Sequence, residues 1–502
     1  MDRRLLMLSL GMFAMGTDNF VVAGILPSVA ESLHTSVSLA GQMVTVYALS
    51  YAVMAPVMAA VAAGWPRKFL LVLALGIFVV GNAITALATD LDTVLFSRAL
   101  AGLGAAMFAP TALGVATSLA SPERRGRALA TVTAGLAGAT ALGAPLGTFI
   151  GGFGSWRSTL WFVAALGLIS MAGVWTMLRA VPQPARITLR ERLAPVRDIR
   201  IALTLLTSLF AFGGFLMVYT YSGLVLDRVT GGDERLLAGL LLIWGFAATA
   251  GNLYAGRLVD RFDSRRIINA GLAVGIVDFC ALPWTSAHPA SAVAALVAWG
   301  LVGWGLIVPQ QHRLVKIAPQ AAPLLLALNN TATYAGLACS GVLGGLALLY
   351  VDRHYLGVVG AALIGIALLL ALAAHSCIER ERSRNEAQPR PGNCLAGLGL
   401  GHPDGRACGS ARKRKCLFHV NSFPLTAIRK VRSVSTDSAT VSAPSNAIAT
   451  TQSGIVARSC AYFSAALASA AIGKPIAHQL GENATPRRNT FGASTAKMKS
   501  AK

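Results

Sequence analysis

The chain has 502 residues, of which 55% are hydrophobic and 13% are charged, yet it carries 43 Lys and Arg against 21 Asp and Glu. A soluble protein devotes roughly a quarter of its residues to charged side chains, so this composition excludes most soluble folds. Apolar runs of about 18 or more residues recur along the chain, and each can cross a hydrocarbon layer about 30 Å thick as a helix. The sequence predicts an all-α, polytopic membrane protein.

Twelve apolar spans follow one another in chain order. Their centres lie at about residues 16, 51, 79, 106, 140, 168, 212, 246, 276, 301, 335 and 366. The first run contains an acidic residue and no small-residue cleavage site, which favours a membrane helix over a signal peptide. The longest polar connection, residues 179–200, separates residues 1–178 from residues 201–377. We therefore expect two halves of six transmembrane helices joined by a cytoplasmic central loop.

Lys and Arg gather in alternate loops, which predicts the orientation in the membrane. If the N-terminus is cytoplasmic, the inner segments hold 19 Lys and Arg and the outer loops hold four. Short basic loops stay on the cytoplasmic side. We expect a multi-pass protein of the cytoplasmic (inner) membrane with both termini of the membrane domain inside.

The net charge divides unevenly between two parts of the chain. Residues 1–377 hold 24 Lys and Arg and 15 Asp and Glu (24 − 15 = +9), and residues 378–502 hold 19 and 6 (19 − 6 = +13). The second part is rich in Ser, Ala, Thr, Gly and Arg and has no sustained periodicity, which predicts a disordered, low-complexity basic tail. Binding of nucleic acid or anionic lipid is the less favoured interpretation of this tail, and we expect no nucleic-acid partner.

Two short basic connections occupy equivalent places in the two halves. The connection between the eighth and ninth spans contains Gly256, Asp260, Arg261, Arg265 and Arg266. The connection between the second and third spans contains Arg67 and Lys68, and its alignment with the other copy places Ala62 or Ala63 opposite Asp260. In the complete copy, Gly256 is expected to permit close helix approach, and Asp260 to cap the next helix or pair with an Arg. The alternative is that these basic residues only anchor the topology.

Ionisable residues inside spans are costly, at about 2.5 to 3.5 kcal/mol each, so each one suggests a function. Asp18 lies over half-way along the first helix and Arg98 lies a few residues into the fourth. If these helices are neighbours, the two residues can form a buried ion pair. The functional interpretation is that Asp18 takes up and releases a proton, and the alternative is a fixed structural pair. Asp278, in the ninth helix, has no evident cationic partner and is expected to face a polar crevice.

Small and polar residues mark two further features of the spans. The fifth span contains Gly143, Pro145, Gly147 and Gly151, a smooth face beside a proline, which suggests a helix at which the halves hinge or seal. Uncharged polar residues that could line a substrate cavity include Gln42, Tyr47, Asn82, Asn329 and Asn330. Near span ends, Tyr and Trp are more often interfacial anchors. No Cys or His spacing indicates a metal site, so we expect no metal or cofactor.

Four motifs in order resemble those of the major facilitator superfamily, and within it the twelve-helix drug:proton antiporters that export sugars, nucleosides or phenicols. The motifs are Gly16-Thr-Asp18-Asn-Phe-Val-Val-Ala-Gly-Ile-Leu-Pro27 in the first helix, Arg98-Ala-Leu-Ala-Gly102-Leu-Gly104 in the fourth, Gly143-Ala-Pro145-Leu-Gly147-Thr-Phe-Ile-Gly151 in the fifth, and the Gly256 to Arg266 loop. The resemblance implies proton coupling by Asp18 and Arg98, an antiporter motif in the fifth helix, and a gating role for the basic loops. The chain departs from the family in the first loop, where Ala62 and Ala63 stand in the region of the usual acid.

We therefore expect a monomeric proton-coupled exporter of a small organic molecule that moves between two facing states. A proton-coupled importer would have the same fold and buried pair. A non-transporting membrane sensor that signals through the basic tail is a third possibility. An enzyme is least expected, because no nucleophile, metal cluster or phosphate-binding loop is apparent.

Overall fold

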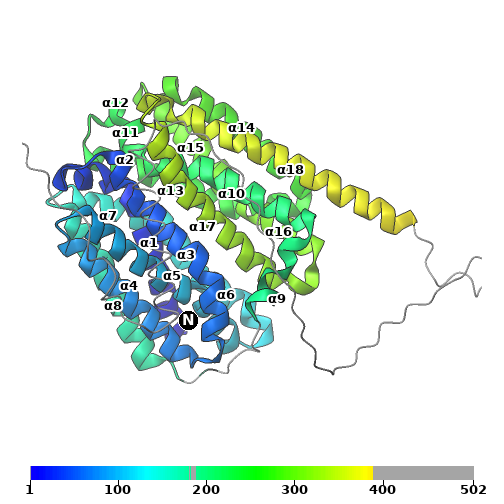
Figure 1. Cartoon of the computed structure of the whole chain (residues 1–502). Coiled ribbons are helices and arrows are strands. Elements are labelled where there is room, and N and C mark those ends of the chain that lie inside the picture. Colours follow the sequence, from blue (N-terminus) through cyan, green and yellow to red (C-terminus); the bar gives the residue numbers. More distant parts are fainter. Residues whose placement is uncertain (1, 180, 182–187, 388–502) are drawn as a thin grey trace, which may run out of the picture. The chain divides into compact units, whose positions relative to one another are not determined.

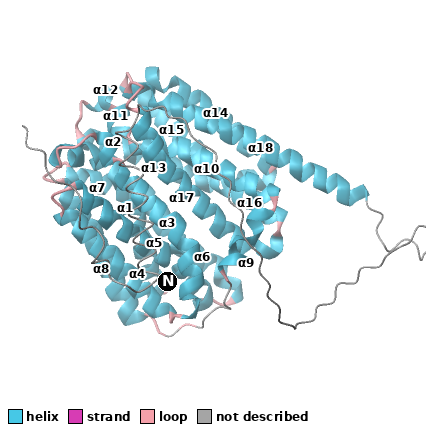
Figure 2. Ribbon diagram, viewed as in Figure 1, coloured by secondary structure: helices cyan, strands magenta, loops and turns pink. Residues whose placement is uncertain are grey.

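The computed structural model describes residues 2–179, 181 and 188–387, which form helices joined by loops, with no strand among them (Figure 2). The first half consists of α1 (Arg3–Ser32), α2 (Val37–Ala40) with α3 (Gln42–Val61), α4 (Arg67–Leu87), α5 (Leu91–Leu119), α6 (Arg125–Gly138) with α7 (Ala144–Gly151), and α8 (Trp156–Met177). The second half consists of α10 (Ile199–Thr220), α13 (Glu234–Arg261), α14 (Ser264–Thr285), α15 (Pro289–Gly305) with α16 (Ile307–Ile317), α17 (Ala322–Ala347) and α18 (Leu356–Ala387). Short helices α9 (Leu189–Leu193), α11 (Ser222–Val225) and α12 (Asp227–Thr230) lie in the connections.

The helices reproduce the twelve predicted spans. Eleven stretches of the described chain are long and apolar enough to cross a membrane by length and composition. The predicted eleventh span corresponds to α17, which is 26 residues long but carries two adjacent asparagines and several glycines that make it less apolar. Helix α18 continues to Ala387, past the predicted boundary at residue 377 (Figure 1). The rest of the predicted tail, residues 388–502, lies outside the described residues.

Carboxylates at the N-caps explain where several helices begin. The side chains of Asp2, Asp90, Asp198 and Asp233 accept hydrogen bonds from backbone N–H groups in the first turns of α1, α5, α10 and α13. Such caps satisfy N–H groups that have no partner inside the helix. Helix α4 lacks this device, because Pro66 occupies its N-cap position and provides no capping side chain. The first N–H groups of α4 therefore have no side-chain cap.

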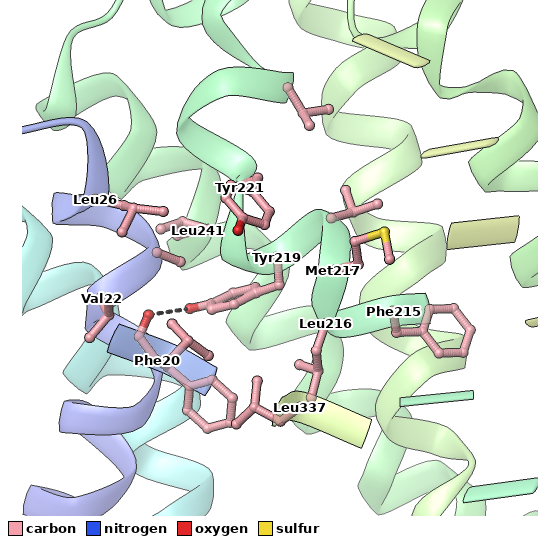
Figure 3. Close-up of a cluster of buried hydrophobic side chains, with 14 of the residues drawn as sticks. Phe20, Val22, Leu26, Phe215, Leu216, Met217, Tyr219, Tyr221, Leu241 and Leu337 are labelled. Atoms are coloured by element: carbon pink, nitrogen blue, oxygen red, sulfur yellow. Dashed lines mark hydrogen bonds between the residues drawn. The ribbon is translucent and has the colours of Figure 1, made fainter. Parts of the chain in front are cut away.

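The two ends of the bundle differ in charge and in packing. We call the basic end the one formed by the loop before α4, the loop between α5 and α6, helix α9 and the loop before α14; the loops preceding α5 and α13 form the acidic end. At the acidic end both halves share one apolar core, in which Phe20, Val22 and Leu26 of α1 meet Leu216 of α10 and Leu241 of α13 (Figure 3). Toward the basic end, each half has a separate apolar cluster. The halves therefore share a continuous apolar core at the acidic end, whereas toward the basic end Tyr334 of α17 packs against the first-half cluster.

Glycines allow the halves to approach each other closely. A Cβ atom added to Gly245 of α13 would collide with the backbone of Thr140 and would lie 2.9 Å from the Cα atom of Ala141, both in the first half. One added to Gly341 of α17 would lie 3.0 Å from the carbonyl oxygen of Gly41. By contrast, Gly256 has open space at the Cβ position. The expectation that Gly256 permits close helix approach is therefore wrong, because no atom of a neighbouring helix lies within 4 Å of its Cβ position.

We predict that Gly245→Ala lowers the thermal unfolding midpoint of the detergent-purified protein. The added methyl group meets backbone atoms that cannot rotate away, and overpacking of this kind costs about 1 to 3 kcal/mol. Gly256→Ala, on the same helix, is the matched control and should leave the midpoint unchanged or raise it, because Ala favours a helix over Gly. Equal effects of the two substitutions would contradict the packing described here.

Candidate functional site

A buried ion pair links α1 to α5. Arg98 Nη1 lies 2.7 Å from Asp18 Oδ1, and the two side chains are 1% and 0% exposed. The pair that the sequence predicted is therefore confirmed. Because an unpaired charge at this depth would cost several kcal/mol, each residue makes the other tolerable.

Two further helices of the first half support Arg98. Its guanidinium lies over the ring of Tyr47 from α3, 4.6 Å from the ring centroid, and Nη1 donates to Asn82 Oδ1 of α4 at 3.4 Å. The Asn82 side chain is oriented by its own amide, which donates to the carbonyl oxygen of Phe78 at 3.0 Å. Tyr47 and Asn82, which the sequence assigned to a cavity lining, are thus contacts of Arg98.

The pair leaves polar atoms without a protein partner. Within the described chain, Asp18 Oδ2, Arg98 Nε and the hydroxyl group of Tyr47 are buried and have no hydrogen-bond partner. Most buried polar groups in proteins are hydrogen-bonded, so a cluster of exceptions suggests a functional site. A carboxylate oxygen that accepts no hydrogen bond is available to bind a proton.

The fifth span packs against the same part of α1. A π-helical turn, Ala139–Gly143, joins α6 to α7 directly before Pro145. Cβ atoms added to Gly143, Gly147 and Gly151 would meet Thr17, Val21 and Ile25 of α1, respectively. The glycines of the predicted antiporter motif therefore face the helix that carries Asp18.

Polar contacts reinforce the seal at the acidic end, and the sequence did not indicate most of them. The Tyr219 hydroxyl of α10 donates to the carbonyl oxygen of Phe20 at 3.1 Å (Figure 3). Ser28 of α1 donates to the carboxylate of Glu234 at the start of α13. Gln42 Nε2 donates to the carbonyl oxygen of Gly341 at 3.4 Å. Gln42 therefore joins the two halves at their closed end, where each of these bonds holds the halves together.

The two asparagines of α17 have different surroundings. Asn329 is buried and accepts a hydrogen bond from Ser208 of α10 at 2.7 Å, so it is satisfied within the second half. Asn330 is exposed and donates to the Tyr51 hydroxyl of α3 at 2.8 Å. The Tyr51 ring also stacks on Tyr334 of α17, with centroids 3.7 Å apart. Tyr51 thus contacts the second half on the basic side of the shared core, and this contact must break if the halves separate there.

The basic loops have the following contacts. Lys68 lies 5.4 Å from the Trp175 ring centroid, and Arg265 forms a salt bridge of 3.5 Å with Glu379 of α18. Arg261 and Arg266 are exposed. Asp260 is expected from the sequence either to cap the next helix or to pair with an Arg. It does not cap α14, because α13 continues to Arg261 and the N-cap residue of α14 is Asp263, and it forms no salt bridge with an Arg among the described residues. Asp278 is half-buried, and its Oδ2 atom has no hydrogen-bond partner among the described residues.

A cavity of about 300 Å³ opens near the basic end. Its lining includes Met58 of α3, Arg67 of α4, Met107 of α5, Arg192 of α9 and Pro323 of α17. None of the five residues that the sequence assigned to a substrate cavity lines it. The sequence counted Arg192 only as a topology anchor.

Comparisons with known proteins agree with this arrangement. The family model of the Major Facilitator Superfamily matches residues 8–321. An uncharacterised MFS-type transporter of Bacillus subtilis, YbcL, is 29% identical over 369 residues, which cover 74% of this chain and 95% of that protein. A chloramphenicol resistance protein of Streptomyces lividans is 30% identical over 306 residues, which cover 60% of this chain and 78% of that protein.

Solved structures show the same fold. A crystal structure of the nucleoside transporter NupG superposes with a TM-score of 0.59 at 12% identity, and the match covers 75% of this chain and 99% of that one. At this identity the likeness concerns the fold alone. With the family match over most of the membrane-spanning part of the chain, the conclusion is that this protein belongs to the Major Facilitator Superfamily and is a multi-pass membrane transport protein.

Proposed function

We propose that this protein is a proton-coupled efflux transporter that exports a small organic molecule, and that Asp18 is the residue that carries the proton. The Asp18–Arg98 pair is the observation that supports this most strongly. Both side chains are fully buried, Asp18 lies midway along α1, and it retains an oxygen that accepts no hydrogen bond from the described chain. The 30% identical chloramphenicol resistance protein supports a drug-like substrate.

The proposed orientation places the basic end in the cytoplasm, with both termini of the membrane domain inside. The distribution of Lys and Arg supports it, because short basic loops remain on the cytoplasmic side. In this orientation the shared apolar core lies toward the outer face and the cavity of about 300 Å³ lies at the cytoplasmic end, which supports an inward-facing conformation. Substrate would then reach the transporter from the cytoplasm.

In the proposed cycle, Asp18 loses its proton in the inward-facing state as substrate binds, and Arg98 compensates the resulting negative charge. The two halves then rotate relative to each other, so that the Asp18–Arg98 pair becomes accessible to the outer solution. There the substrate leaves and Asp18 binds a proton again. A proton that moves inward down 100 mV releases about 2.3 kcal/mol. At about 1.4 kcal/mol per decade, this could sustain a gradient of roughly 50-fold for a neutral substrate.

We predict that Asp18→Asn abolishes coupling between substrate export and the proton gradient. The amide cannot bind and release a proton at working pH, so export against a gradient should fall at least tenfold. Substrate exchange at equal concentrations on both sides, which needs no proton movement, should persist. The substrate is chosen with a growth-inhibition panel in cells with and without the protein, and proton flux is then measured in proteoliposomes.

Asp278→Asn is the matched control for this experiment, because it removes a carboxylate from a span of the second half. We expect it to retain coupling. Export by Asp18→Asn that still follows the pH gradient would refute the assignment of Asp18, and uptake driven by the inward proton gradient would identify an importer.

The alternative of a purely structural pair makes a different prediction for stability. Arg98→Gln leaves the Asp18 carboxylate buried without its partner, which should cost about 3 to 5 kcal/mol and lower the thermal unfolding midpoint. Adding Asp18→Asn to Arg98→Gln should restore much of the midpoint, because neither side chain is then charged, yet coupled export should stay absent. Restored coupling in the double variant would show that the pair serves stability alone.

The proposed orientation can be tested with single cysteines in a variant whose native cysteines are replaced by serine. A membrane-impermeant maleimide applied to intact cells should label Asp233→Cys at the acidic end and spare Arg127→Cys at the basic end, because only the former faces outward. The reverse pattern would invert the orientation.

A further inference from the structure

The cavity at the basic end combines two positive side chains with walls that contain no acid. Arg67 at the start of α4 and Arg192 of α9 both line it, and its other lining residues are apolar or neutral. The two guanidinium groups lie close enough for their charges to act on each other. Neither forms a salt bridge with any residue in the described part of the chain. Two partly buried cations beside each other are unfavourable without a counter-charge.

Arg192 is held in place but incompletely bonded. Its Nη2 donates to the carbonyl oxygen of Ala59 in the last turn of α3 at 3.1 Å, whereas its Nε is buried and has no hydrogen-bond partner among the described residues. Partial burial lowers the pKa of the Arg192 guanidinium, and no carboxylate opposes this effect. Glu191, the acid beside it, is occupied in a capping box with Thr188. Arg192 lines the cavity, and no carboxylate of the described chain forms a salt bridge with its charge.

The start of α4 adds a third positive group. This helix of 21 residues has Pro66 at its N-cap position and no capping side chain. The N-terminus of such a helix carries a partial positive charge and free N–H groups, which favour anions. Arg67 is the first residue of α4 and lines the cavity, so the cavity lies beside this terminus.

The loop before α4 contains no acid that could neutralise these groups. Ala62 and Ala63, which align with Asp260 of the second half, are buried between α3 and α4. The negative charge must therefore come from outside this loop. Guanidinium groups bind phosphate through paired N–H donors, which gives them a preference for such ligands.

We propose that this cavity binds an anionic phosphate group, either free phosphate or the headgroup of an anionic phospholipid, between Arg67, Arg192 and the N-terminus of α4. The cavity of about 300 Å³ has room for a phosphate together with part of an attached chain, and the side chains of Met58, Leu70 and Met107 form its apolar walls. Pro323 of α17 also lines it, so the bound group lies where the second half approaches the first. This site does not depend on the direction of transport.

The test uses the full chain purified in a neutral detergent and titrated with inorganic phosphate at constant ionic strength. A saturable rise in the thermal unfolding midpoint is expected for the unmodified protein. Arg192→Gln and Arg67→Gln should each weaken phosphate binding at least tenfold. Arg190→Gln is the matched control, because Arg190 is an exposed residue of the same short helix and does not line the cavity.

Two results would overturn the proposal. One is the absence of a saturable response, and the other is an equal loss of affinity in Arg190→Gln, which would indicate only diffuse attraction to a basic surface. Arg67 lies at the end of a span, so Arg67→Gln could misfold. Arg192→Gln, which lies outside the spans, then carries the test, and its midpoint without phosphate verifies that it folds.

A second experiment distinguishes the two sources of phosphate. The protein is placed in nanodiscs of phosphatidylcholine alone or with phosphatidylglycerol. If the lipid headgroup occupies the site, phosphatidylglycerol abolishes the response to phosphate and remains bound to the unmodified protein, but not to Arg192→Gln, in native mass spectrometry. If free phosphate is the ligand, the response persists in both nanodiscs and again requires Arg192. Persistence of the response in Arg192→Gln would count against the site.

Discussion

A charge buried in a medium of low polarity needs an opposite charge, and this constraint organises the first half of the protein. The Asp18–Arg98 pair fixes α1 against α5, and Tyr47 and Asn82 bring α3 and α4 to the same point. Four helices thus converge on one guanidinium. The pairing makes burial of Asp18 tolerable. The glycines of the fifth span pack on the neighbouring face of α1, against Thr17, Val21 and Ile25.

The two ends of the molecule are held by different kinds of interaction. At the acidic end, apolar packing and interhelical hydrogen bonds join the halves, and glycines allow the backbones to approach closely. Toward the basic end, the contacts between the halves include the stacking of Tyr51 on Tyr334 and the hydrogen bond from Asn330 to the Tyr51 hydroxyl. The packed apolar core at the acidic end resists separation more than these few contacts do.

Sequence patterns predicted the spans, the division into halves and the Asp18–Arg98 pair. A long apolar run forms a membrane helix, and a charge inside such a helix needs a partner of opposite sign. The patterns failed where the outcome depends on which face of a helix meets a neighbour. Gln42 joins the halves and Asn329 bonds within one half, although both are polar residues in spans. Gly256 resembled other helix-packing glycines but faces open space. The missing acid at Ala62 and Ala63 was visible, but the position of Arg192 near that loop depends on how the central loop folds back.

The π-helical turn in the fifth span affects which face of α7 is turned toward α1. Gly135, Gly143, Gly147 and Gly151 face Ser9, Thr17, Val21 and Ile25 of α1, so both partners use positions spaced by multiples of four. On a regular helix, four residues turn by about 400°, so such a stripe drifts by about 40° at each repeat and winds away from its partner. The turn at Ala139–Gly143 holds extra residues and counteracts that drift midway along the helix. Removal of one residue there would rotate α7 relative to α6 by about 100° and turn its glycines away from the helix that bears Asp18.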